Sequence, residues 1–214
     1  MSKFEIVIVD YNTGNVDSIL KAVKTTNQSV VISNNKKDIQ NSKKIILPGQ
    51  GSFDYGMNQL NELEIKNIIL DKVLNDKIPI LGICLGMHIF GDWGYENNIK
   101  TEGLGLINGE IKKIPSSVKL PHIGWNEVKF KKKDQILKSI ENNKDFYFVH
   151  SYYFDCLDKD EILATSNYEF EFPSIIKNKN VYGFQFHPEK SLNNGIKLLN
   201  LSLIHISEPT RQEA

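Results

Sequence analysis

The chain of 214 residues has few of the features that would assign it to several large classes of protein. It contains two cysteines, Cys84 and Cys156, whose contexts do not suggest a disulfide framework, so a reducing cytoplasm is expected. Its 26 Lys plus Arg balance its 26 Asp plus Glu, so no long-range attraction to nucleic acid or an anionic membrane is expected. No apolar stretch reaches the length of a membrane span, and we expect no signal peptide before Phe4.

Strand-like and helix-like segments alternate along the first half of the chain. Residues 4–9 and 44–47 are apolar runs typical of buried strands, whereas residues 15–25 and 57–75 have helical patterns. From about Gly103 the pattern changes to short strands separated by glycine and proline. The sequence therefore predicts an α/β fold with an open mixed, mostly parallel sheet, helices on both faces and an antiparallel extension.

One segment combines a buried strand, a tight turn and a cysteine. Residues 78–81 are apolar, and residues 82–88 continue as Gly-Ile-Cys-Leu-Gly-Met-His, a sequence that favours a helix after the turn. Small residues two positions before and after Cys84 let the chain turn sharply, as in a nucleophile elbow. The thiol would then project at a helix N-terminus, where the dipole and free N–H groups favour a thiolate. A buried structural cysteine is the alternative.

A second segment, far along the chain, supplies the groups that such a cysteine requires. Residues 182–191 read Tyr-Gly-Phe-Gln-Phe-His-Pro-Glu-Lys-Ser, an alternating strand that ends in His187, with Glu189 two residues later. A cysteine nucleophile needs a base that takes its proton and a third group that orients the base. Cys84, His187 and Glu189 fit these three catalytic roles in type and order, although an incidental structural histidine is the alternative.

These two segments together resemble the signature motifs of the class I, or triad, glutamine amidotransferases. Three further segments narrow the resemblance: residues 10–15 (Asp-Tyr-Asn-Thr-Gly-Asn), 121–126 (Pro-His-Ile-Gly-Trp-Asn) and 148–152 (Phe-Val-His-Ser-Tyr). With them the chain looks like the glutaminase subunits of imidazole glycerol phosphate synthase, from histidine biosynthesis. The resemblance runs from about residue 4 to about residue 200, which is nearly the whole chain.

The resemblance implies an activity and a partner. The chain would hydrolyse glutamine to glutamate and ammonia through a cysteine thioester, without a metal or cofactor. In the family, the ammonia crosses to a cyclase subunit of the (β/α)₈-barrel type in a heterodimer. There it reacts with a ribulosyl aminoimidazole carboxamide nucleotide and yields imidazole glycerol phosphate. Nothing in the resemblance implies binding to nucleic acid or to a membrane.

The loop at residues 48–51 is a candidate part of an oxyanion hole. Thioester formation passes through a tetrahedral oxyanion, which needs preorganised N–H donors, and the N–H of Leu85 directly after the nucleophile is one natural donor. Residues 48–51 read Pro-Gly-Gln-Gly, and the glycines allow the backbone to approach a ligand or to change its peptide orientation. In the family this loop supplies the second donor, which makes the Gln50 N–H the candidate here. A simple strand-to-helix turn is the alternative.

Four residues are expected to bind glutamine. His88 lies one helical turn beyond Cys84, where class I members usually carry glutamine, and it either bonds the substrate or merely packs. Glu96 matches the carboxylate that in the family binds the α-amino group of glutamine. Ser151 and Tyr152 could line the glutamine pocket through backbone contacts.

Three residues correspond to positions near the cyclase interface of the resembling enzymes: Trp125, Tyr147 and Lys190. Tryptophan and tyrosine are common interface anchors, although both are also ordinary core residues. The neighbours Gly124 and Asn126 favour a turn around Trp125 over a packed strand, and hence an interface role for this tryptophan.

Other functions stay open at the level of sequence. A sister glutaminase could serve the amination of a nucleotide-linked sugar in surface-polysaccharide biosynthesis, because Gln50, His88 and the segment before Glu96 depart from the usual pattern. A non-catalytic subunit that kept the fold is a second alternative, against which the complete triad argues. A vitamin B6 glutaminase is disfavoured, because residues 121–126 match the imidazole glycerol phosphate type.

The end of the chain differs from the rest. We assign residues 1–200 to a glutamine amidotransferase domain and expect residues 201–214 to be a non-native tail. The tail contains the only arginine, Arg211, and resembles the translated read-through of a sequencing adapter. Pro209 would also prevent a helix from continuing through it.

Overall fold

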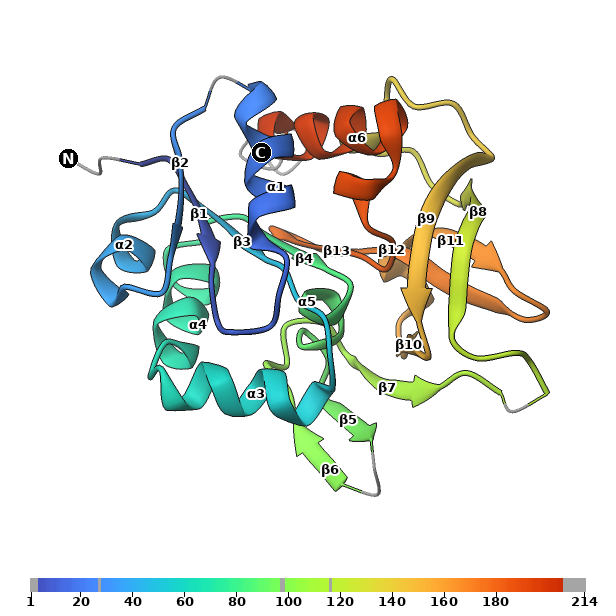
Figure 1. Ribbon diagram of the computed structural model, residues 1–214, viewed down its shortest axis with the longest axis horizontal. Helices are drawn as coiled ribbons and strands as arrows, with labels where there is room; N and C mark the ends of the chain where they lie inside the picture. Colours follow the sequence, from blue (N-terminus) through green and yellow to red (C-terminus); the bar gives the residue numbers. More distant parts are fainter. Residues whose placement is uncertain (1–3, 27, 97–98, 116, 206–214) are drawn as a thin grey trace.

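The computed structural model describes residues 4–26, 28–96, 99–115 and 117–205, and in them two sheets are flanked by helices (Figure 1). The strands of the larger sheet are β1 (Ile6–Val9), β2 (Val30–Ser33), β3 (Lys44–Leu47), β4 (Ile80–Ile83), β8 (His122–Phe130), β9 (Lys144–His150), β11 (Ile162–Asn167), β12 (Glu171–Asn178) and β13 (Val181–Phe184). Those of the smaller sheet are β5 (Trp93–Glu96), β6 (Ile99–Glu102), β7 (Gly109–Lys113) and β10 (Tyr152–Cys156).

The helices of the described residues are mostly short. The α-helices are α1 (Val16–Val23), α2 (Lys36–Asn41), α3 (Phe53–Glu62), α4 (Lys66–Leu74), α5 (Leu85–His88) and α6 (Leu192–His205). Four 3₁₀ turns accompany them: η1 (Lys24–Thr26), η2 (Gln135–Leu137), η3 (Lys159–Glu161) and η4 (Pro188–Lys190). In this part of the chain, no helix combines the length and hydrophobicity that crossing a membrane requires.

The larger sheet has a parallel half and an antiparallel half. Its spatial order is β2-β1-β3-β4-β13-β12-β11-β8-β9, and the pairs from β2 to β13 are parallel while those from β13 to β9 are antiparallel. This arrangement confirms the predicted open mixed sheet with an antiparallel extension. The separate four-stranded sheet, in the order β10-β7-β5-β6, was not predicted.

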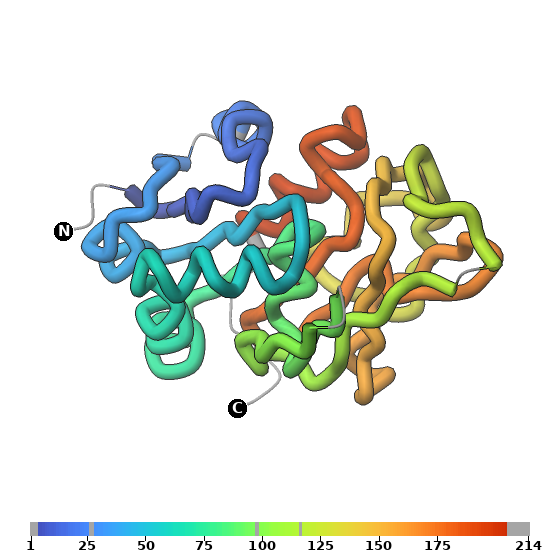
Figure 2. The backbone as a smooth tube through the Cα atoms, turned by 60° about the horizontal axis from the view of Figure 1, so that its bottom comes forward, coloured from blue at the N-terminus to red at the C-terminus, as the bar shows by residue number. Residues whose placement is uncertain are grey.

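Both faces of the parallel half are buried, as the apolar run of β1 indicated. Ile6 and Ile8 belong to the core under α1 and α6, whereas Val7 and Val9 belong to the core under α2, α3 and α4. Successive side chains of a strand point to opposite faces, so a strand with helices on both sides must be apolar throughout. Figures 1 and 2 show α1 and α6 side by side, with α3 and α4 across the sheet from them.

The topology brings the two halves of the candidate triad together. Strands β4 and β13 are parallel neighbours, with Ile83 opposite Phe184 in the register. Cys84 follows β4 directly, and His187 is the third residue after β13. Ligands and catalytic groups of open α/β sheets gather at the carboxyl ends of the strands, and the thiol and the imidazole lie at that edge.

The last helix crosses the boundary that we expected at residue 200. Helix α6 runs to His205, and Ser202 and Leu203 are buried in the core. Residues 206–214 of the expected tail lie outside the described residues. The division of the chain at this point stays a prediction.

The close packing at the turn after β4 gives a first test of this fold. A Cβ atom on Gly86 would lie 1.7 Å from the Leu47 carbonyl oxygen, which belongs to the sheet and cannot move away. We therefore expect Gly86→Ala to lower the free energy of unfolding by about 3 kcal/mol or more. Denaturation in urea measures the change.

Gly56 is the matched control, because its added Cβ would meet only side-chain atoms, the nearest being Cδ1 of Ile89 at 3.0 Å and Cδ2 of Leu85 at 3.2 Å, and no backbone atom of the sheet. Gly56→Ala should be neutral or stabilising, since alanine favours a helix interior by up to about 1 kcal/mol. A Gly86→Ala protein as stable as the Gly56→Ala protein would contradict the described approach of α5 to β3.

Candidate active site

The backbone at Cys84 forms the sharp turn that the sequence predicted. Cys84 has φ +54° and ψ −109°, a conformation that a non-glycine residue adopts only at a cost. Its N–H donates to the Phe184 carbonyl at 2.7 Å, and its own carbonyl accepts from the N–H groups of Met87 and His88. These three bonds fix the strained residue from both sides and leave the thiol at the start of α5.

Two glycines make room for the turn. A Cβ on Gly82 would lie 2.5 Å from the Phe90 ring and 2.6 Å from the backbone of Gly86. A Cβ on Gly86 would overlap the Leu47 carbonyl. The elbow therefore depends on the small residues at both positions.

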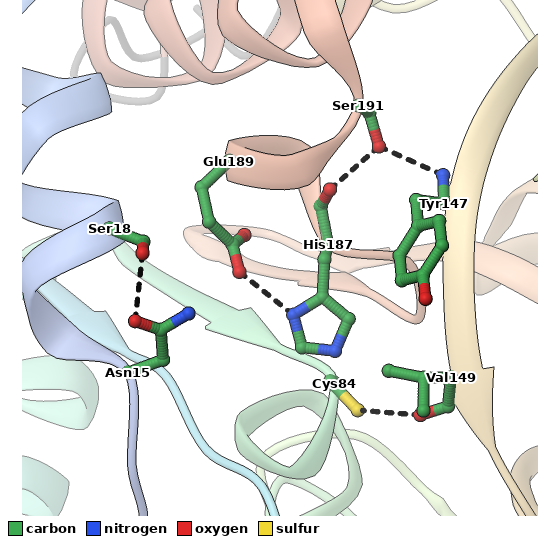
Figure 3. Close-up of polar contacts among 8 residues, drawn as sticks. All are labelled: Asn15, Ser18, Cys84, Tyr147, Val149, His187, Glu189 and Ser191. Atoms are coloured by element: carbon green, nitrogen blue, oxygen red, sulfur yellow. Dashed lines mark hydrogen bonds and ion pairs between the residues drawn. The ribbon is translucent and has the colours of Figure 1, made fainter. Parts of the chain in front are cut away.

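His187 and Glu189 form a buried pair beside the thiol (Figure 3). The Nδ1–H of His187 donates to Oε1 of Glu189 at 2.9 Å, and their side chains are only 3% and 1% exposed. Figure 3 shows the imidazole between Glu189 and Cys84, with its other nitrogen on the side of the sulfur. Cys84 itself is 7% exposed, and its thiol also lies 3.9 Å from the Val149 carbonyl. The structure thus brings together all three residues of the predicted triad.

The charge state of His187 follows from its neighbours. Burial alone would lower its pKa, but the neighbouring side chains of Cys84 and Glu189 outweigh burial and raise the pKa to about 10. At neutral pH the imidazole is therefore held as an imidazolium next to the sulfur. In this form it can donate a proton to a leaving group.

The backbone of His187 is held by residues for which we predicted no such role. The His187 N–H donates to the Tyr147 carbonyl at 2.9 Å. The hydroxyl of Ser191 donates to the His187 carbonyl at 2.6 Å and accepts from the Tyr147 N–H at 2.9 Å, as Figure 3 shows. Ser191 closes the predicted motif at residues 182–191, so its place in that motif was the available signal.

Both predicted oxyanion donors are occupied by carbonyl groups in this structure. The Leu85 N–H donates to the Gly49 carbonyl at 3.3 Å, and the Gln50 N–H donates to the Thr13 carbonyl at 2.7 Å. The hydroxyl of Tyr11 donates to the Pro48 carbonyl and fixes the start of the same loop. The loop at residues 48–51 lies beside Cys84, but neither the Gln50 N–H nor the Leu85 N–H is free to bind an oxyanion.

A cavity of about 170 Å³ opens beside the thiol and contains all the predicted substrate residues. Its walls come from the oxyanion loop, the start of α5, strand β5 and the turn between β9 and β10. The lining residues are Gln50, Gly51, Phe53, Cys84, Leu85, His88, Glu96, Val149, His150, Ser151 and Tyr152. The volume suits a ligand smaller than a drug-sized molecule, such as an amino acid.

His88 and Glu96 both line the cavity, the first with a neutral imidazole and the second with a carboxyl group. Burial lowers the pKa of His88 to about 4, against the opposing effect of Gln185, so the imidazole is neutral at pH 7. Its Nε2 pairs with Oε1 of Gln185 at 2.7 Å. Burial raises the pKa of Glu96, whose Oε2 accepts the Phe53 N–H at 2.8 Å. A carboxylate at the cavity wall is suited to an ammonium group.

Two of the three predicted interface residues, Trp125 and Tyr147, are directly opposite each other on the paired strands β8 and β9. Trp125 is 49% exposed, and its ring meets that of Tyr147 edge-on, with centroids 5.9 Å apart. Trp125 and Ser191 line a groove of about 460 Å³, and the exposed Lys190 directly precedes Ser191. The turn that we expected around Trp125 is instead part of strand β8, where Gly124 has φ +137°. The tryptophan is exposed although it lies within a strand, and the pairing of β8 with β9 continues through Gly124.

No group of three or more His, Cys, Asp or Glu side chains within the described ranges is arranged to hold a metal ion. The second cysteine, Cys156, is buried in the core under α3 and α4, where burial raises its pKa to about 12. Cys84 and Cys156 are both free.

The chain belongs to the class I glutamine amidotransferases, because the model of that family matches residues 7–206. Among curated proteins it is 46% identical over 196 residues to imidazole glycerol phosphate synthase subunit HisH 2 of Methanococcus maripaludis, with 91% of this chain and 96% of that protein covered. It is also 42% identical over 199 residues to imidazole glycerol phosphate synthase subunit HisH of Leptospira borgpetersenii, with 91% and 97% covered.

Solved structures of low sequence identity share the fold. One described as a glutamine amidotransferase superposes with a TM-score of 0.68 at 18% identity, covering 92% of this chain and 98% of the other. The structure of PurLQS from Thermotoga maritima gives a TM-score of 0.69 at 20% identity, covering 94% and 98%. These likenesses support the observed mixed sheet and carry nothing about substrate or partner.

The buried histidines predict a loss of stability in acid. Burial lowers the pKa of His88 and His122 to about 4 and that of His150 to about 3. Between pH 6.5 and 4 the unfolded chain binds protons that the folded chain does not. The free energy of unfolding should therefore decrease as the pH is lowered, by up to about 1.4 kcal/mol per pH unit for each histidine.

His187 acts in a different pH range, because its pKa is raised to about 10. Its stabilising contribution is complete below about pH 6.5 and is lost as the pH rises through about 10. Urea denaturation at pH 7, 6 and 5 tests the acid branch, and His88→Gln should make the decline less steep. A free energy of unfolding that stays constant from pH 7 to pH 5 would show that these histidines are not buried as neutral groups.

Proposed function

We propose that this chain is the glutaminase subunit of an imidazole glycerol phosphate synthase and that Cys84, His187 and Glu189 are its catalytic triad. The observation that carries the proposal is the strained Cys84 at the mouth of an amino-acid-sized cavity, beside the buried pair of His187 and Glu189. The named relatives, which are all HisH subunits, support the same reading. The sugar-aminating alternative is accordingly not favoured.

The proposed reaction has two halves. The Cys84 thiolate attacks the carboxamide carbon of glutamine, and the carbonyl oxygen becomes an oxyanion. The C–N bond then breaks, His187 gives its proton to the leaving nitrogen, and ammonia departs from a thioester. In the second half, His187 takes a proton from water, the hydroxide attacks the thioester, and glutamate leaves as the thiolate returns.

The substrate would be held by the groups that line the cavity. The Glu96 carboxylate pairs with the α-ammonium group of glutamine, which its place on the wall permits. His88 contacts the polar backbone groups of the substrate as a neutral imidazole, and the turn at Ser151 and Tyr152 supplies backbone contacts. The N–H groups of Leu85 and Gln50 receive the oxyanion once their present carbonyl partners have moved away.

Ammonia would pass to a partner subunit. We propose a cyclase of the (β/α)₈-barrel type, bound as a heterodimer over Trp125, Tyr147 and Lys190, in the cytoplasm. The exposed ring of Trp125 and its groove are suited to an apolar anchor on the partner. His187 is bonded through its backbone to Tyr147, which connects the proposed interface with the triad.

Substitutions in the triad test the assignment of roles. Cys84→Ser should abolish glutaminase activity while the fold remains, because a hydroxyl is a far poorer nucleophile than a thiolate at neutral pH. His187→Ala should lose about as much activity, since triad members act as a unit, whereas Glu189→Gln should lose less because it only orients His187. Glutamate release by the complex measures each effect.

The second cysteine provides the control for this experiment. A diazo-ketone analogue of glutamine should label Cys84 and spare Cys156, which is buried away from the cavity and whose pKa is raised to about 12. Labelling of Cys156 instead, or a Glu189→Gln enzyme weaker than the His187→Ala enzyme, would require the roles to be reassigned.

The blocked oxyanion donors predict that the isolated chain is a poor glutaminase. Binding of the cyclase and its nucleotide should turn the loop at residues 48–51 and free the N–H groups of Leu85 and Gln50. The rise should be mainly in kcat, because the donors act on the transition state, and one donor is worth on the order of a hundredfold or more. Glutamate release with and without partner and nucleotide measures the effect.

Alkylation of Cys84 by iodoacetamide is the control, because this displacement forms no oxyanion. When the nucleotide is added to the complex, the rate of alkylation should stay nearly constant while kcat for glutamine rises. Full glutaminase activity of the chain alone would contradict the gate and indicate a hole that is already formed.

A further inference from the structure

Two histidines, His122 and His150, lie next to each other in the core and take no part in the proposed reaction. They face each other across strands β8 and β9, where the register pairs His122 with His150. Nδ1 of His122 lies 2.9 Å from Nε2 of His150. Both side chains are nearly inaccessible, with 3% and 6% exposure. An imidazole pair buried at hydrogen-bond distance must share one proton between the two facing nitrogens.

The two histidines belong to a series of hydrogen bonds that ends at a backbone carbonyl group on each side, and these carbonyl groups fix the position of each proton. Nδ1 of His150 lies 2.8 Å from the Tyr152 carbonyl oxygen, which can only accept, so Nδ1 carries the hydrogen. Nε2 of a neutral His150 is then an acceptor, and Nδ1 of His122 must donate to it. Nε2 of His122 is an acceptor in turn, and Nδ2 of Asn126 lies 3.4 Å from it.

The far end is fixed by a second carbonyl group. Nδ2 of Asn126 also donates to the Asn167 carbonyl at 2.9 Å, which sets the orientation of the amide. Each hydrogen bond of this series is therefore donated in the same direction, from Asn126 to His122, from His122 to His150 and from His150 to Tyr152. Reversal of one tautomer would set two hydrogens or two lone pairs against each other.

The surroundings keep both imidazoles neutral. The ring of His122 stacks on those of Tyr168 and Phe148, with ring centroids 4.0 Å and 5.1 Å away, and His122 is only 3% exposed. Burial lowers the pKa of His122 to about 4 and is the main cause that lowers the pKa of His150 to about 3. The titratable groups that act on His150 are His122, His88 and His187, and each disfavours a further positive charge. Both imidazoles are therefore neutral at pH 7.

The chain of bonds ends at the wall of the cavity beside Cys84. His150, Ser151 and Tyr152 line that cavity, and the bond from His150 to the Tyr152 carbonyl spans the turn between β9 and β10. The other end lies on β8, next to the exposed Trp125. Gly124, whose φ is +137°, lies between His122 and Asn126 in this strand.

We propose that His122, His150 and Asn126 are positioning residues that hold the turn at Ser151 and Tyr152 in the shape that binds glutamine. This inference rests on the proposed glutaminase function and adds residues to it that do not touch the reacting atoms. Because the turn forms the substrate wall and not the nucleophile or the oxyanion hole, its distortion acts on KM for glutamine and leaves kcat largely intact.

The tautomers themselves can be measured on the wild-type chain, without any assay of activity. Long-range ¹H–¹⁵N correlation spectra distinguish the Nδ1–H, Nε2–H and imidazolium forms of each histidine. The inference predicts that His122 and His150 are both neutral with the hydrogen on Nδ1 at pH 7, and that both remain so at pH 5. An Nε2–H tautomer or an imidazolium at either residue at pH 7 would overturn it.

Asn126→Asp tests the consequence for the substrate, because it keeps the size of the side chain but removes its N–H donors. The carboxylate can only accept, and burial disfavours an imidazolium at His122. We therefore expect His122 to stay neutral and to turn its hydrogen to Nε2, so that its Nδ1 no longer donates to His150. If the turn loses the support of about one hydrogen bond, KM for glutamine should rise by roughly tenfold in the complex with the cyclase. The value of kcat should change much less.

Asn61→Asp is the matched control, since it makes the same chemical change at an exposed position on α3 and should leave KM unchanged. A changed tautomer at His122 with an unchanged KM would overturn the positioning role alone. A wild-type complex without glutaminase activity would overturn the proposed function and this inference with it.

Discussion

The site depends on one strained residue, Cys84, whose backbone is held at φ +54° between strand β4 and helix α5. The strain is maintained by the bond from its N–H to Phe184 and by the close approach of Gly86 to Leu47. Because Phe184 belongs to β13, the bond that fixes the thiol also ties it to the strand that leads to His187. The parallel pairing of β4 and β13 therefore sets the relative position of nucleophile and base.

The same turn accounts for the occupation of the two candidate oxyanion donors. The N–H of Leu85, which the elbow points toward the cavity, is occupied by the Gly49 carbonyl, and the Gln50 N–H is occupied by Thr13. A backbone donor buried without water needs a partner, and the loop at residues 48–51 provides one in the absence of substrate. In the proposed activation these two bonds would be exchanged, which assigns the gate to the loop and leaves Cys84, His187 and Glu189 in place.

The order of elements and the approach of Cys84, His187 and Glu189 to one another could be predicted from the sequence, because both follow from local patterns. The apolar run of β1 indicated burial on both faces, and the spacing of Gly82, Cys84 and Gly86 indicated the elbow. The smaller sheet could not be predicted in the same way. Its β7 and β10 have five residues each, and their pairing joins segments that are distant in sequence, with Gly109 opposite Cys156.

The features of the site that could not be predicted from the sequence are hydrogen bonds between segments that meet only in the folded protein. Ser191 stood inside a motif, but its bonds to His187 and Tyr147 depend on how η4 meets β9. The occupation of the Gln50 N–H by Thr13 depends on a loop that lies beside it only after folding. The direction of the bonds through His122 and His150 depends on two carbonyl groups that no sequence pattern places.

The most direct test of this account is the crystal structure of the complex with Cys84 acylated by a glutamine-derived inhibitor. If the elbow and the loop act as described, the oxygen of the adduct will accept hydrogen bonds from the N–H groups of Leu85 and Gln50, and the Gly49 carbonyl will have left Leu85. His187 will remain bonded to Glu189. An adduct that forms on Cys84 while Gly49 still occupies Leu85 would contradict the account.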